Sequence, residues 1–151
     1  MLYHIPLEVL SIENEGFHIF VTAMINGKQA RLLIDTGASR TVFDRDRIIG
    51  FIGQDESLVH KSDKLSTGLG TNTMESALVV LKEFKLGKLM LNDFQAVALE
   101  MSHVNFSYQH LGLDHVDGVL GGDILHEYQA TIDYRLEEMK LRNKSKSAEK
   151  A

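Results

Sequence analysis

Asp35 is the residue whose surroundings in the sequence most clearly indicate a chemical role. Asp35 ends the apolar run Leu32-Leu33-Ile34 and is followed by Thr36 and Gly37. A charge at the end of a buried strand is costly unless it is hydrogen-bonded or used. The Thr36 hydroxyl can form a hydrogen bond, and Gly37 lets the backbone pass close and offer its N–H to the carboxylate. An Asx turn that simply closes a strand is the alternative interpretation.

A second motif follows much later in the chain. Val119-Leu120-Gly121 is an apolar-apolar-glycine triplet, preceded by an irregular stretch and followed by GDILHEY, which is typical of a short helix. The secondary-structure elements around the two motifs must position them. The sequence pattern predicts that most of these elements are strands.

Period-two alternation over residues 17–25 and the following Asn26-Gly27 predict a hairpin over 17–35. Residues 41–43 predict a short strand, after which Asp44 caps helical turns through Ile52. Residues 63–81 predict a strand, a glycine tip and a second strand, and further strands with turns at Gly87-Lys88 and Asn92-Asp93 follow. Residues 102–116 predict a loop. Residues 118–128 predict a strand, a glycine corner and a helix, and the chain ends in a predicted hairpin that turns at 135–138.

Composition excludes several classes of protein. The chain has 151 residues and a net charge of −5, which predicts one domain (core about 17–141, flexible tail 143–151) and no nucleic-acid partner. It has no cysteine, and therefore no disulfide framework or thiolate metal site. No leader-like start and no long apolar stretch occur, so we expect a soluble, cytoplasmic protein without a membrane partner.

The two motifs together resemble the retropepsin-like aspartic protease family. LLIDTGAS is similar to that family's catalytic strand and loop, GVLGGDIL to its glycine corner and helix, and YQATIDYRLEEMKL to the terminal segment of one pepsin lobe. STGLGTN resembles the flap in position and glycine content. The resemblance implies an all-β fold: a single-lobe β-barrel with one short helix after Val119-Leu120-Gly121, acting as a two-fold homodimer.

The same resemblance implies roles for individual residues. Asp35 is the expected catalytic residue, one per subunit. The other implied positions are the active-site loop Thr36, Gly37, Ala38 and Ser39, the substrate-binding flap Gly68, Leu69 and Gly70, and the pocket wall Val119, Leu120 and Gly121. The sequence departs from the retroviral enzymes at Gly122, where they carry an arginine that bridges to the active-site loop, so that bridge is absent here.

Acid-protease chemistry needs two carboxylates that share one proton. The chain contains one Asp-Thr-Gly; Asp117-Gly118 lacks the threonine, and Asp133 falls in the terminal hairpin. The expected function is therefore an aspartic endopeptidase that cuts extended, apolar-flanked peptides, with one Asp35 from each of two chains and no cofactor or metal. The alternative is a weakly active or inactive dimeric module that binds peptides or assembles with the same fold.

Two further patterns have competing interpretations. His103, His110 and His115 lie near Asp114 and Asp117, but their spacing fits no zinc signature, and loop histidines explain them better. Residues 25–50 and 84–127 share a faint order of glycine turn, apolar strand, glycine corner and helix. This order marks either an internal two-fold or a chance likeness.

Overall fold

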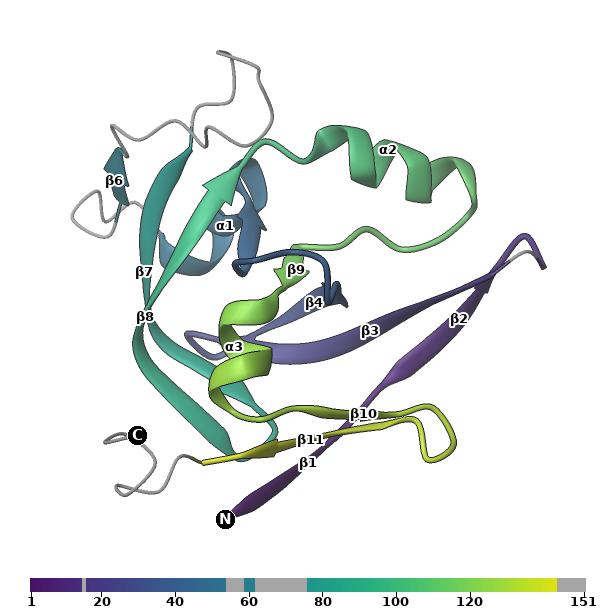
Figure 1. Ribbon diagram of the computed structural model, residues 1–151. Helices are drawn as coiled ribbons and strands as arrows, with labels where there is room; N and C mark the ends of the chain where they lie inside the picture. Colours follow the sequence, from purple (N-terminus) through teal and green to yellow (C-terminus); the bar gives the residue numbers. More distant parts are fainter. Residues whose placement is uncertain (15, 54–58, 62–75, 144–151) are drawn as a thin grey trace.

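The computed structural model describes residues 1–14, 16–53, 59–61 and 76–143 (Figure 1). The strands in this part of the chain are β1 (Leu2–Pro6), β2 (Glu8–Ile12), β3 (Gly16–Ile25), β4 (Lys28–Ile34), β5 (Val42–Asp44), β6 (Val59–Lys61), β7 (Ala77–Leu86), β8 (Leu89–Leu99), β9 (Gly118–Leu120), β10 (Thr131–Asp133) and β11 (Glu138–Arg142). The helices are α1 (Arg45–Ile52), α2 (Ser102–His110) and α3 (Gly122–Glu127).

The larger sheet closes into a barrel. Its strand order is β2-β3-β4-β9-β5-β8-β7-β6, and an additional β3–β7 pairing joins the two sides. The ring that results contains β3, β4, β9, β5, β8 and β7, while β2 and β6 extend from it. The expected all-β barrel is therefore confirmed.

The predicted hairpins formed where turn chemistry was strongest. Asn26 and Gly27 have positive φ of 50° and 83° and join β3 to β4 with Ile25 opposite Lys28. Leu86 lies opposite Leu89 across the Gly87-Lys88 turn. The expected terminal hairpin is the β10–β11 pair, which β1 completes as a second sheet in the order β1-β11-β10.

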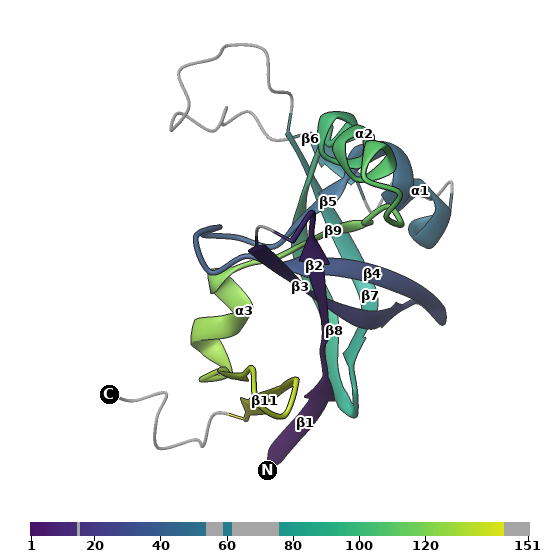
Figure 2. The ribbon, with the colours of Figure 1, turned by 90° about the vertical axis from the view of Figure 1, so that its right-hand side faces the viewer.

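The core lies inside the barrel and extends to the second sheet. Alternate residues of β4, namely Ala30, Leu32 and Ile34, point inward and are buried. Ile5 of β1 and Met139 of β11 join the same cluster. The packing thus reaches residues before the predicted core range, and the three-stranded sheet lies at the opposite end of the molecule from α1 and α2 (Figures 1 and 2).

An internal two-fold relates the two halves of the barrel. β4 pairs in parallel with β9, and β5 pairs in parallel with β8, while β5 and β9 pair antiparallel with each other. Exchanging β3-β4-β5-α1 for β7-β8-β9-α3 leaves this pairing pattern unchanged. The faint repeat in the sequence therefore reflects a repeat in topology.

Three expectations were wrong. The expected loop at 102–116 contains the helix α2, so the described residues hold this helix in addition to α1 and α3, which were both expected. The expected turn at Asn92-Asp93 lies within β8, whose register with β7 is the same on either side of Asp93. Asp44 precedes α1, but its carboxylate makes no capping hydrogen bond and accepts the N–H of Met101 at 3.2 Å instead.

Three sequence predictions fall outside the described residues. These are the first strand expected in 63–81, the flap at Gly68, Leu69 and Gly70, and nearly all of the tail at 143–151. Among the helices of the described part, none is long and apolar enough to cross a membrane.

Candidate active site

Asp35 directly follows the last residue of β4. Its N–H donates to the carbonyl of Leu120 at 3.0 Å, which extends the β4–β9 pairing by one step. Its carboxylate accepts the N–H of Gly37 at 2.9 Å, as the sequence predicted. The side chain is exposed in the single chain, however, rather than buried at the strand end as expected. Asp35 is therefore held in orientation on one side and open to solvent on the other.

The glycine corner lies directly beneath the active-site loop. A Cβ added to Gly121 would approach the Arg40 carbonyl oxygen to 2.5 Å and the Ala38 carbonyl oxygen to 2.9 Å. The N–H of Gly122 donates to the Ala38 carbonyl at 2.7 Å. The two predicted motifs thus form one structure, in which the second supports the loop that carries the first.

Asp123 fastens the far end of this loop. Its carboxylate accepts the N–H of Thr41 at 3.0 Å and the Thr41 hydroxyl at 2.7 Å. The same hydroxyl oxygen accepts the N–H of Gly121 at 3.1 Å, and Thr41 is fully buried. The loop is therefore tied to the start of α3 without the arginine bridge of the retroviral enzymes. Sequence reasoning missed both residues, although an acidic residue in the first turn of a helix is a recognised signal.

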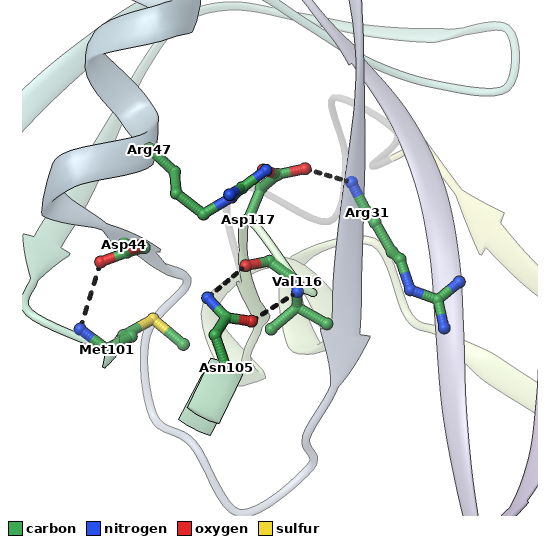
Figure 3. Close-up of polar contacts among 7 residues, drawn as sticks. All are labelled: Arg31, Asp44, Arg47, Met101, Asn105, Val116 and Asp117. Carbon is green, nitrogen blue, oxygen red and sulfur yellow. Dashed lines mark hydrogen bonds and ion pairs between the residues drawn. The ribbon is translucent and has the colours of Figure 1, made fainter. Parts of the chain in front are cut away.

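A second polar pair, formed by Asp117 and Arg47, links the residue before β9 to helix α1. The Asp117 carboxylate accepts Arg47 Nε at 2.7 Å and the N–H of Arg31 at 2.8 Å (Figure 3). This ion pair therefore joins the start of β9 to both α1 and β4.

Helix α2 is held by polar bonds at its start and in its first turns. The Asn105 side chain bonds both backbone groups of Val116, its carbonyl accepting the N–H at 2.7 Å and its amide donating at 3.0 Å (Figure 3). Asp44 accepts the Met101 N–H just before the helix. Met101, Tyr108 and Val116 then pack on Phe20, forming a small second core on the outside of the barrel.

Asp35 lines an open pocket of about 520 Å³. The pocket is also lined by Phe17 and His18 of β3, Leu33 of β4, Thr36, and Ile132 and Tyr134 of the terminal hairpin. Phe17 is 65% exposed and Tyr134 is 60% exposed, so two large aromatic rings flank the carboxylate in solvent. Among its described lining residues, Asp35 is the sole carboxylate.

Val119, Leu120 and Gly121, the predicted pocket wall, are not among the described residues that line this pocket. Leu120 is fully buried in the main core, and Val119 is half-buried and packs against the second core. Leu33, from the strand before Asp35, lines the pocket instead. Thr36, Gly37 and Ser39 are exposed, and Ala38 is half-buried.

A closed barrel, an Asp-Thr-Gly loop and a supporting glycine corner together define an acid-protease lobe. The family model for aspartyl proteases matches residues 21–124, so the chain belongs to the aspartyl protease family. No curated protein sequence matches the chain.

Two solved structures share the fold. A retropepsin-like aspartic protease from Rickettsia conorii matches at 18% identity with a TM-score of 0.55, covering 95% of this chain and 90% of that one. The retroviral protease-like domain of Ddi1 from Leishmania major matches at 16% identity with a TM-score of 0.54, covering 83% of this chain and 88% of that one. The fold is therefore that of the retropepsin-like aspartic proteases.

Proposed function

We propose that the protein is an aspartic endopeptidase whose active site forms between two copies of the chain. The observation that carries this proposal is Asp35 itself: a single, oriented carboxylate that is solvent-exposed in an open pocket with no second carboxylate among its described lining residues. A two-fold axis near Asp35 would bring a second Asp35 to it, because a closed dimer contributes every residue twice.

The chemistry follows from two carboxylates that share one proton. The ionised Asp35 takes a proton from a water molecule, whose oxygen attacks the carbonyl carbon of the scissile peptide bond. The protonated Asp35 hydrogen-bonds the carbonyl oxygen and stabilises the charge that develops there. Collapse of the tetrahedral intermediate breaks the C–N bond as the amine leaves with a proton. No metal or cofactor takes part.

The substrate is an extended peptide with apolar side chains on both sides of the cut. Apolar surface around Asp35 comes from Phe17, Leu33, Ile132 and Tyr134, and the rings of Phe17 and Tyr134 are largely exposed. An extended chain places alternate side chains on the same face, so a pocket next to the carboxylate reads a residue near the cut.

A digest of a peptide library tests the activity. Wild type and Asp35→Asn are incubated side by side, and the products are sequenced by mass spectrometry. We expect cleavage by wild type alone, with apolar residues flanking the sites. Cleavage of equal rate in both samples would overturn the proposal, and peptide binding without cleavage would favour the binding module.

A further inference from the structure

His18 and Tyr108 form a polar pair at the edge of the pocket that Asp35 lines. His18 lies on β3 and lines the pocket, whereas Tyr108 comes from helix α2. His18 Nδ1 and the Tyr108 hydroxyl are 2.9 Å apart, and the two rings meet edge to face at 84°. The mechanism above uses neither residue.

Tyr108 is fixed in place by its surroundings. It is 4% exposed, and its ring packs edge to face on Phe20 with ring centroids 5.8 Å apart. The bonds of Asn105 to Val116 and of Asp44 to Met101 hold α2 against the barrel (Figure 3). The hydroxyl therefore occupies one position relative to β3.

This arrangement decides which nitrogen of His18 carries a proton. Burial raises the pKa of Tyr108, with Arg31 lowering it and Asp35 raising it, so the hydroxyl stays protonated at neutral and acidic pH. Among the described residues, His18 Nδ1 is the acceptor within reach of that hydroxyl. A hydroxyl that donates to Nδ1 leaves the neutral ring with its proton on Nε2.

Protonation of His18 does not remove this donor. The imidazolium also carries a proton on Nε2, so this nitrogen can donate a hydrogen bond in either state. The other side chains of the pocket named above, apart from Asp35, Thr36 and the Tyr134 hydroxyl, are apolar. A bound side chain that covers His18 without accepting its N–H would leave a buried donor unpaired, which is unfavourable.

We propose that His18 is a specificity residue, whose Nε2–H selects a substrate side chain with a hydrogen-bond acceptor at one position beside the cut. Glutamine and methionine have nearly the same shape, but glutamine carries a strong acceptor in its amide oxygen, whereas the methionine sulfur accepts only weakly. A site that hydrogen-bonds its substrate discriminates strongly against an analogue without the bonding group. This inference rests on the proposed function and refines it, since one position beside the cut then departs from the apolar preference of the others.

The test compares peptides that differ only by glutamine or methionine, placed in turn at each of the positions flanking a cleavage site found in the library digest. For wild type we expect one position at which kcat/KM is about tenfold higher for glutamine. His18→Phe should bring that ratio to about one or below, because its ring fills the space without a donor. Tyr108→Phe should lower the ratio less, since His18 then keeps its place but exchanges tautomers. His103→Phe, on the exposed side of α2, is the matched control and should keep the wild-type ratio.

A binding measurement separates this inference from the proposed function. The same peptides are titrated into Asp35→Asn protein with and without His18→Phe. A glutamine preference in binding that depends on His18 supports the inference even if wild type cleaves nothing. Cleavage without a glutamine preference, or a preference that survives His18→Phe, overturns it and leaves the proposed function standing. Neither cleavage nor binding of any peptide would overturn both.

Discussion

The carboxylate of Asp123 accepts hydrogen bonds from both the backbone N–H and the hydroxyl of Thr41. Asp123 lies in the first turn of α3, and Thr41 closes the loop that begins at Asp35. These two residues therefore connect the support of the active site to its catalytic loop. The geometry of the loop therefore depends on two uncharged donors of Thr41 and the carboxylate of Asp123, rather than on an ion pair.

Replacing Asp123 by alanine should impair turnover more than substrate affinity. The Thr41 N–H and hydroxyl would lose their shared acceptor, which costs about 1–3 kcal/mol for buried donors. The Asp35 loop would then be free to shift, and small displacements of a reacting group reduce kcat strongly. Steady-state kinetics and thermal unfolding of the same protein measure both effects.

Conservative changes at Thr41 provide the control. Thr41→Ser keeps the hydroxyl that bonds Asp123 and Gly121, whereas Thr41→Val keeps the shape and removes it. We expect near-normal kcat for serine and a large loss for valine. Equal kcat in the two variants would show that the Asp123–Thr41 contact does not position the loop.

Gly121→Ala should destabilise the protein and lower its activity. The new Cβ would lie 2.5 Å from the Arg40 carbonyl oxygen, so the Asp35 loop would have to move away. Overpacking of this kind costs about 1–3 kcal/mol. Gly50→Ala in α1 is the matched control, because its Cβ would meet nothing within 4 Å and alanine favours helix. A melting temperature for Gly121→Ala at or above that of Gly50→Ala would contradict the close packing.

Much of the fold was predictable because its signals are local. The Asn26-Gly27 turn and the period-two alternation of β3 both predict the same hairpin. The Gly87-Lys88 turn and the strands that flank it do the same for β7 and β8. Asp93 shows the limit of such signals: it adopts a positive φ of 52°, as turn residues do, yet β8 pairs with β7 in the same register on both sides of it. Helix α2 begins after Met101, which is no capping residue, and depends on side-chain bonds to distant segments.

The candidate site was predictable only where the motif names its residues. Asp35, Gly37 and the glycine corner follow from two short stretches of sequence. Asp123 and Thr41 could not be paired in advance, because they lie 82 residues apart in the chain and no local pattern links them. His18 and Tyr108 meet only because α2 folds back onto β3.

The ion pair between Arg47 and Asp117 should contribute to stability rather than to catalysis. Asp117→Ala would leave Arg47 Nε and the Arg31 N–H without their acceptor, and we expect a loss of about 1–3 kcal/mol in unfolding free energy. Asp114→Ala, at an exposed position nearby, should change stability by less than about 0.5 kcal/mol. Chemical denaturation compares the two, and similar stabilities would contradict a structural role for the pair.

Mixing active and inactive subunits tests the central claim most directly. Wild type is refolded together with increasing amounts of Asp35→Asn, mass spectrometry confirms that mixed dimers form, and peptide cleavage is measured per wild-type chain. If each active site needs Asp35 from both chains, an equal amount of variant should lower this activity to about half, and a threefold excess to about a quarter. Activity per wild-type chain that stays constant while mixed dimers form would contradict the shared active site.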